Sequence, residues 1–508
     1  MRIKKLLLPL LFICTIFVLV FRVFTRPGTV NSMPQTNAYD EIDTYVEAQM
    51  QRLNIPGASL AIVEGDQIVH MRGFGQAQLD GATPSPQTPF FIGSLTKSFT
   101  ALAVMQLVEA GKIDLDAPVQ RYLPWFQVAD AQASAQITVR HLLNQTSGLS
   151  ESSGRVPLAD FNDSPDATEH QARALKTVEL NHPVGSTCEY SNSNYNLLGL
   201  IVEAVSGESY EAYVQKHIFT PLAMNQSYTS KKAAEQHGLA VGHQFWFAQP
   251  AAAPNMPVPH GSLPSGQLIS SAEDMAHYLI AQLNGGRYND TQILSPDGIN
   301  EMHHGVAEYV QMGLSFGKYG MGWFVDDSNG SKISWHTGII PNYFAYMALL
   351  PEQNKGVILL LNGYHYLMTP ALTETGAGVA AIMAGEKPET SQATMMPWLM
   401  RGQVLIPILQ IIGVVFTLGL LRRWRLDPLS HPSKGRMWEL FILPSLIINL
   451  LLALLLLPVL GPIRGFWRLF MPDFSWLALI CGSFAAIWAF LRTGLILRVL
   501  KTPTKVDG

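Results

Sequence analysis

The chain has 508 residues, 48% of them hydrophobic, and its mean hydropathy of +0.16 is high for a purely soluble protein and indicates membrane segments. Residues 27–399 carry 34 acidic and 17 basic side chains. A domain this acidic is a poor candidate for binding nucleic acid, because it would repel the phosphate backbone.

The first predicted element is an uncharged apolar run, residues 6–21, behind Arg2, Lys4 and Lys5. Its core is short enough for a cleaved signal peptide, and this alternative stays open. No small-residue cleavage site follows the run, however, which favours an uncleaved membrane anchor over residues 1–26. A polar linker over residues 27–38 comes next.

A single domain of ordinary enzyme size is predicted over residues 39–385. It begins with a helix over 39–53 and two strand-like runs, 58–63 and 67–75, joined by a Glu-Gly-Asp turn. An apolar helix then follows, from Ser94 to a C-terminal cap at Gly111.

The middle of this domain is predicted to be helical, and strands return late in the chain. A closing helix is expected over about 370–384. Strands at both ends around a helical middle predict an α+β fold, in which helices flank an antiparallel sheet assembled from distant segments and an α-rich subdomain is inserted. The late strand-like runs are spaced like a meander: 332–337, 343–350 and 356–362.

The C-terminal region is predicted to be a membrane bundle. After a second linker, 386–403, three apolar runs within 404–498 are each long enough to span a bilayer, and a tail over 499–508 follows. Basic residues gather at the N-terminus, between the first two runs and in the tail, which places all three regions, and hence the C-terminus, in the cytoplasm. The acidic domain then faces outward, periplasmic or cell-surface, in a multi-pass membrane protein. The predicted spans are 404–421, 441–460 and 475–491.

The outward loop 461–474 contains Phe466, Trp467 and Phe470, which we interpret as an interfacial aromatic belt. Cys188 is the only cysteine of the outward domain, so no disulfide within that domain is expected. The pair His303-His304 is adjacent and accompanied by no HExxH motif, so we expect a solvated surface and no metal there. No cofactor is expected.

Ser94-Leu95-Thr96-Lys97 is the most informative motif. A serine followed three residues later by a lysine at a helix start places a hydroxyl and an amine on one face. The amine can activate the serine if burial keeps it neutral part of the time. Taken alone the motif is weak, because a capped surface helix with a solvated lysine has the same letters.

Two further segments strengthen it: Tyr190-Ser191-Asn192 before a helix, and His336-Thr337-Gly338 at the end of a late strand. SxxK, YSN and HTG in this order resemble the serine β-lactamase and penicillin-binding protein superfamily, in its branch of class C β-lactamases and D-alanyl-D-alanine carboxypeptidases. The resemblance covers about residues 39–385 and includes His141-Leu142-Leu143 and Leu268 to Met275.

This resemblance implies that Ser94 forms an acyl-enzyme and that Lys97 and Tyr190 share the proton transfer. It implies that Asn192 holds Lys97 and the substrate amide, and that the backbone N–H groups of Ser94 and Ile339 form the oxyanion hole. Substrate binding is expected at Asn192, His336, Thr337 and Gly338.

His336 stands where many relatives have lysine. A histidine is charged only conditionally at neutral pH, so recognition of a substrate carboxylate is expected to weaken above about pH 6.5. Gln145, where relatives often carry histidine, is expected to be a structural corner.

The function expected from these residues is that of a membrane-anchored, outward-facing serine hydrolase or acyltransferase, similar to a penicillin-binding carboxypeptidase. Its partners would be the membrane and a small-molecule or peptidoglycan-type substrate, such as D-alanyl peptides or esters of the cell wall, with no nucleic acid. The alternatives are an esterase or β-lactamase on the same scaffold, and a non-catalytic sensor of β-lactams or wall fragments.

Overall fold

The structure is a computed structural model that describes residues 38–311, 314–327, 332–427, 430 and 432–501. The apolar run 6–21 and the linker up to residue 37 lie outside the described residues. From Ile42 onward the described residues belong to one compact unit, which contains the predicted spans and all but the first residues of the predicted outward domain.

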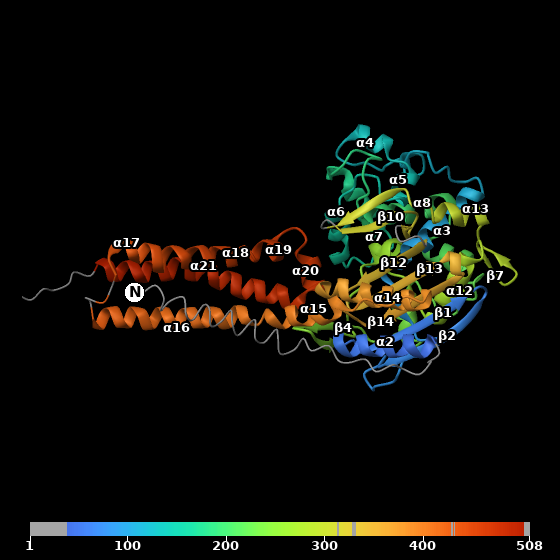
Figure 1. The fold of residues 1–508 in the computed structure, drawn as a ribbon. Helices are drawn as coiled ribbons and strands as arrows, with labels where there is room; N and C mark the ends of the chain where they lie inside the picture. The colour runs from blue at the N-terminus through green and yellow to red at the C-terminus, as the bar shows by residue number, and fades with distance from the viewer. Residues whose placement is uncertain (1–37, 312–313, 328–331, 428–429, 431, 502–508) are drawn as a thin grey trace, which may run out of the picture. The chain divides into compact units, whose positions relative to one another are not determined.

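An eight-stranded antiparallel sheet is the centre of the domain, with strand order β2-β1-β14-β13-β12-β11-β10-β9 (Figure 1). β1 pairs with β14 so that Ala58 faces Leu361, and this pairing joins the two ends of the domain. The predicted α+β fold, with a sheet assembled from distant segments, is confirmed. The strands are β1 Gly57–Glu64, β2 Gln67–Gly75, β9 Ala307–Gln311, β10 Leu314–Tyr319, β11 Phe324–Asp326, β12 Ile333–Ile340, β13 Tyr343–Leu350 and β14 Lys355–Leu361.

Helices cover the sheet because their apolar residues pack on its buried side chains. α12 (Ala272–Leu283) contacts β1 and β14, whereas α14 (Thr369–Ala384) contacts β13 and β14. α14 also meets α2 (Ala38–Leu53), where a Cβ on Gly378 would lie 2.1 Å from the Tyr45 hydroxyl. The two predicted terminal helices of the domain are therefore present and packed together.

The α-rich insertion lies between β2 and β9, as predicted. α3 (Thr96–Glu109) is its central helix, with eleven of its fourteen residues buried, and it packs against α8 and α11. The other helices of this region are α4 Ala131–Gln136, α5 Val139–Leu143, α6 Glu151–Arg155, α7 Ala167–Arg173, α8 Asn192–Ser206, α9 Tyr210–Val214, α10 Lys231–Glu235, α11 Leu263–Gly266 and α13 Pro296–Met302.

Short elements complete the domain. β3 pairs with β6, and β7 pairs with β8. A three-stranded sheet has the order β15-β4-β5. Their bounds are β3 Phe90–Phe91, β4 His243–Trp246, β5 Gln249–Ala252, β6 Ile269–Ser270, β7 Arg287–Tyr288, β8 Thr291–Gln292 and β15 Gly363–Tyr364. Single turns used below are η1 Gly93–Leu95, η3 Val156–Ala159 and η8 Tyr366–Met368.

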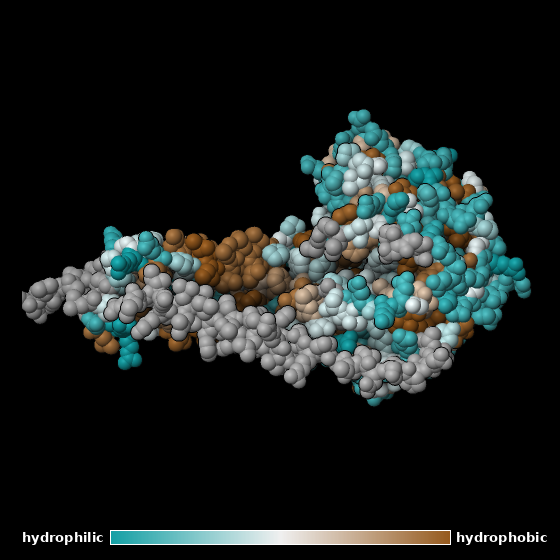
Figure 2. Space-filling model, viewed as in Figure 1, coloured by the Kyte–Doolittle hydropathy of each residue, from teal (hydrophilic) through white to brown (hydrophobic). Residues whose placement is uncertain are grey.

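Three C-terminal segments of the described chain are long and apolar enough to cross a membrane: Thr394–Leu426, Lys434–Leu460 and Pro472–Val499. Each contains one predicted span. Figure 2 shows hydrophobic side chains covering the outside of these helices, as lipid contact requires. The helices of this region are α15 Ser391–Gly402, α16 Leu405–Leu426, α17 Lys434–Met437, α18 Leu443–Ala453, α19 Leu456–Leu460 and α21 Pro472–Lys501, and α20 Arg464–Phe470 lies between the second and third segments.

Two expectations about the C-terminal region need correction. The linker 386–403 contains helix α15. Phe466 and Phe470 do not form an interfacial belt, because both are buried, with their rings 5.4 Å from Tyr366 and 6.0 Å from Tyr364 of the domain that precedes the spans. Other residues of the protein cover the apolar surface of these two rings.

Candidate active site

Ser94 and Lys97 lie at the junction of η1 and α3, where the turn becomes a regular helix. The Lys97 Nζ atom is 3.0 Å from the Ser94 Oγ atom. Ser94 is half-buried, and Lys97 is completely buried. The alternative of a capped surface helix with a solvated lysine is therefore excluded.

The surroundings of Lys97 favour a neutral amine. Nζ donates to the Ser265 carbonyl at 2.6 Å and to the Asn192 Oδ1 atom at 2.8 Å, and among the described residues it forms no ion pair with a carboxylate. Burial lowers the pKa of Lys97 well below its ordinary value of 10.5. A neutral amine that donates its two protons to these oxygens directs its lone pair at the Ser94 hydroxyl.

Tyr190 lies directly before α8 and faces the same amine. Its ring centroid is 4.8 Å from the Lys97 Nζ atom. Burial raises the pKa of Tyr190 well above its ordinary value of 10.0, so the side chain is a phenol and not a phenolate. The opposite directions of the two shifts make Lys97 the better resting base of the pair. Tyr195, within α8, is buried, and its hydroxyl donates to the Leu143 carbonyl at 2.8 Å.

Gln145 holds the Tyr190-Ser191-Asn192 segment in place, a role that sequence reasoning missed. Its side-chain oxygen accepts hydrogen bonds from the Ser191 backbone N–H at 3.0 Å and from the Asn194 amide at 2.5 Å. Gln145 has a φ of +57°, in the left-handed region. The predicted structural corner is thus also an anchor for the active-site loop.

Strand β12 brings the His336-Thr337-Gly338 segment to the serine. β11 pairs with β12 only from Ile333 to Trp335. Beyond Trp335, β12 lies against η1. A Cβ on Gly338 would lie 1.9 Å from the Ile92 carbonyl oxygen, and one on Gly93 would lie 2.3 Å from the Ile339 backbone nitrogen. Only glycine permits this approach, which places the Ile339 N–H beside the Gly93-Ser94 peptide.

His336 is buried, and both of its ring nitrogens have partners inside the fold. Nδ1 lies 2.6 Å from the Thr337 carbonyl and must donate to it, so Nε2 accepts from the Tyr319 hydroxyl at 3.3 Å. Burial, with a smaller contribution from the nearby Lys97, lowers the pKa of His336 to about 3. The histidine is therefore neutral near pH 7, so it does not carry the charge on which the expected weakening of substrate recognition above pH 6.5 depended.

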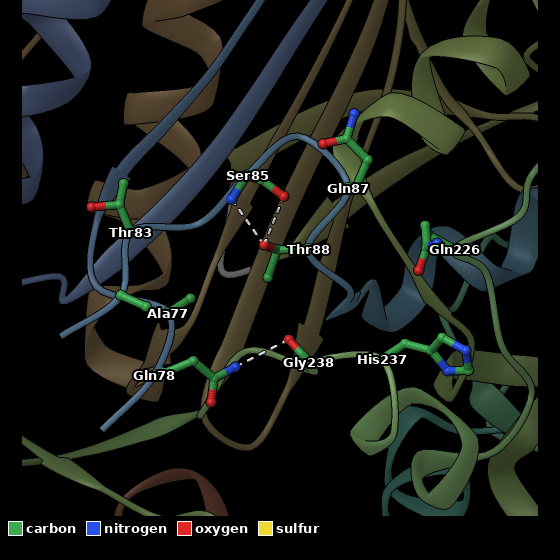
Figure 3. A pocket seen from close by; sticks show the side chains of 10 residues that line it. Ala77, Gln78, Thr83, Ser85, Gln87, Thr88, Gln226, His237 and Gly238 are labelled. Carbon is green, nitrogen blue, oxygen red and sulfur yellow. Dashed lines mark hydrogen bonds between the residues drawn. The ribbon is translucent and has the colours of Figure 1, made fainter. Parts of the chain in front are cut away.

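A surface hollow of about 400 Å³ elsewhere in the domain is shown in Figure 3. Ser94, Lys97 and Tyr190 do not line it. Two of its lining residues are already paired, since Gln78 donates to the Gly238 carbonyl at 3.0 Å and the Ser85 N–H donates to Thr88 at 2.9 Å. The hollow carries no chemistry of the candidate site.

The histidine pair 303–304 differs from its predicted solvated state. His303 is buried, and its Nε2 lies 2.9 Å from the Gln282 side-chain oxygen, whereas His304 is exposed. Across the part of the chain that the structure describes, no group of three His, Cys, Asp or Glu side chains is arranged to hold a metal.

Comparison with known proteins places residues 42–380 in the family described as Beta-lactamase. The chain is 30% identical over 332 residues to Protein flp of Staphylococcus aureus (strain MW2), which covers 64% of this chain and 63% of that protein. It thus spans less than two thirds of that relative. Penicillin-binding protein 4 of Amycolatopsis lactamdurans is 31% identical over 317 residues, covering 61% of this chain and 81% of that protein.

Solved structures show the same fold. The octameric penicillin-binding protein homologue from Pyrococcus abyssi aligns with a TM-score of 0.61 at 30% identity, over 69% of this chain and 78% of that one. A D-stereospecific amidohydrolase from Streptomyces sp. aligns with a TM-score of 0.51 at 23% identity, over 63% of this chain and 94% of that one. With its family match over 42–380 and its SxxK, YSN and HTG segments, the chain belongs to the beta-lactamase family.

Proposed function

We propose that this protein is a membrane-anchored serine hydrolase or acyltransferase that works through an acyl-enzyme on Ser94. The observation that carries the proposal is the Lys97 amine, which is buried, without a carboxylate partner among the described residues, and 3.0 Å from the Ser94 hydroxyl. A serine is a weak nucleophile until a nearby base takes its proton. Lys97 supplies that base.

In the proposed reaction, Ser94 Oγ attacks the acyl carbonyl and its proton passes to Lys97 Nζ. The N–H groups of Ser94 and Ile339 stabilise the oxyanion, because hydrogen-bond donors fixed in place cost no reorganisation when charge develops. The Tyr190 phenol lies beside the amine and shares in delivering the proton to the leaving group. Water or an amine then attacks the Ser94 ester and regenerates the hydroxyl.

The proposed substrates are D-alanyl peptides or esters of the cell wall. Support comes from the similarity to proteins named as penicillin-binding proteins, at about 30% identity. The distribution of basic residues supports an outward-facing catalytic domain, with the C-terminus in the cytoplasm of a multi-pass membrane protein. The domain boundaries, 39–385 for the hydrolase and 404–498 for the spans, stay part of this proposal.

The test is covalent labelling of the full chain in detergent with a fluorescent penicillin, read by gel and intact mass. Wild type is expected to form an adduct that Ser94→Ala abolishes, whereas the exposed Ser186→Ala labels normally. Labelling that persists in Ser94→Ala contradicts the proposal. An adduct that never turns over, on any peptide or ester, indicates a sensor. A reporter fused after Gly508 is expected to be active only in the cytoplasm.

One observation favours esters as a second class of substrate. His336 is neutral and its two ring nitrogens are occupied by Thr337 and Tyr319, so it offers no positive charge to a substrate carboxylate. Acyl donors without a free carboxylate would then react as well as those with one. Matched p-nitrophenyl esters with and without a terminal carboxylate test this, and a kcat/KM strongly favouring the acid would contradict it.

A further inference from the structure

Helix α20, which connects the second and third spans, packs against the catalytic domain through Arg155. The guanidinium carbon of Arg155 lies 4.5 Å from the Phe466 ring centroid and 5.6 Å from that of Tyr366. Arg155 also donates to the Tyr366 hydroxyl at 3.2 Å and to Glu151 at 2.5 Å. Cation–π contacts on both rings, with a carboxylate partner, fix this side chain in one position.

A buried polar contact fastens the same loop to the domain. Asp473, at the start of α21, accepts from His365 Nε2 at 2.8 Å and from the Phe247 backbone N–H at 2.9 Å. The side chains of both Asp473 and His365 are 0% exposed. His365 Nδ1 accepts from the Leu367 N–H, which defines Nε2 as the donor. A buried carboxylate satisfied in this way is costly to separate from its partners.

Close backbone packing adds a third contact. A Cβ on Gly465 of α20 would lie 2.3 Å from the Ala159 side chain in η3, so the two segments touch without room for a larger residue. η3 directly follows α6, the short helix that ends at Arg155. The loop between the spans therefore supports one end of α6.

The other side of α6 supports the catalytic residues. The Gly154 carbonyl accepts from the Asn192 amide at 3.1 Å, and a Cβ on Gly154 would lie 2.5 Å from the Asn192 backbone nitrogen. Asn192 in turn accepts from Lys97 at 2.8 Å. A continuous set of contacts thus runs from Phe466 through Arg155 and Gly154 to Asn192 and Lys97.

We propose that α20 is a positioning element of the active site, with Phe466 and Arg155 as positioning residues that hold α6, Asn192 and thereby Lys97. The inference rests on the proposed function for its kinetic consequences. The C-terminal spans then do more than tether the enzyme, because the loop between two of them completes the support of the catalytic amine. A small displacement of a positioned group is enough to slow a reaction strongly.

The kinetic test uses the full chain in detergent or nanodiscs, with the penicillin probe and the p-nitrophenyl esters. Phe466→Ala is expected to lower the acylation rate constant at least about tenfold, with KM little changed, and Phe466→Tyr to restore it. Phe490→Ala, an equivalent change at a 70%-exposed site on α21, serves as the control and is expected to react as wild type. Equal rates for Phe466→Ala and Phe490→Ala would overturn the proposal.

A double-mutant cycle tests whether Phe466 acts through Arg155. Arg155→Met is expected to slow acylation, and the double variant to be no slower than the worse single variant, since both break one contact. Fully additive effects would show that Phe466 acts by another route and would contradict the proposed path.

Hydrogen exchange gives a readout that does not depend on catalysis. Amides of residues 151–155 are expected to exchange faster in Phe466→Ala than in wild type or Phe490→Ala. Unchanged exchange there overturns the positioning role even if every rate falls. Conversely, labelling that persists in Ser94→Ala refutes the proposed function. The exchange comparison then still decides the role of α20.

Discussion

The side-chain oxygen of Asn192 accepts a hydrogen bond from Lys97 at 2.8 Å, so the group facing the amine is a neutral amide. The nitrogen of the same amide donates to Gly154, which fixes its orientation. A buried lysine beside a neutral acceptor loses its proton readily, whereas one beside a carboxylate keeps it. In the proposed mechanism, residue 192 therefore determines whether Lys97 is available as a base at neutral pH.

Replacing Asn192 with aspartate tests this relationship. The new carboxylate stabilises the ammonium and raises the pKa of Lys97, so the neutral fraction at pH 7 falls. Acylation is expected to slow at least about tenfold at pH 7, one pKa unit being a tenfold change, and to recover as the pH rises. Stopped-flow labelling from pH 6 to 10 measures this. Asn289→Asp, at an exposed turn, is the control, and a pH profile unchanged in Asn192→Asp would refute the role of Lys97 as base.

Lys97 also makes stability depend on pH. Its pKa is lowered in the folded protein and returns to about 10.5 on unfolding, so the unfolded chain binds an extra proton between the two values. Stability from this group therefore rises with pH up to about 10.5 and is lost as pH falls. We expect the Tm of wild type minus that of Lys97→Met, by thermal unfolding in detergent, to increase from pH 7 to pH 9.5. A difference independent of pH would mean that Lys97 is charged in the folded state.

Much of the sheet could be predicted, because its buried strands are apolar and bounded by turn residues. β1, β2, β12, β13 and β14 lie within a few residues of the predicted runs. β9, β10 and β11 were missed, since each is only three to six residues long and β10 is interrupted by Gly317, with a φ of +85°. Short strands whose pairing depends on their neighbours in the sheet leave little pattern in the sequence.

The sequence could predict only those site residues whose side chains carry the chemistry. Ser94, Lys97, Tyr190 and Asn192 meet as the motifs implied. Ser265 contributes only a backbone carbonyl, which any residue could supply. The charge state of His336 was mispredicted, because its burial and its contact with the Tyr319 hydroxyl depend on the tertiary fold.

Two buried histidines are expected to make the protein sensitive to acid. Burial lowers the pKa values of His303 and His336 to about 3, from 6.5. Each contributes stability that is present above pH 6.5 and is lost as the pH falls toward 3. At pH 4.5 the loss is about 2 to 3 kcal/mol for each histidine, from the difference in proton affinity.

Unfolding midpoints between pH 7 and 4.5 measure this sensitivity. His303→Gln and His336→Gln are each expected to flatten the decline in Tm, relative to their own values at pH 7, and the exposed His304→Gln to leave it as in wild type. A decline of equal steepness in all three variants would show that carboxylates, and not these histidines, govern acid unfolding.

Gly338 is the position where a single added methyl group should remove catalysis. A Cβ there would lie 1.9 Å from the Ile92 carbonyl oxygen, so Gly338→Ala must push β12 away from η1. The Ile339 N–H then moves off the oxyanion, and loss of one such donor costs about a hundredfold or more in rate. Acylation by the fluorescent penicillin measures this, with Gly413→Ala as the control because nothing lies within 4 Å of a Cβ at Gly413. If Gly338→Ala folds with a wild-type Tm and acylates at the wild-type rate, the oxyanion hole does not include Ile339.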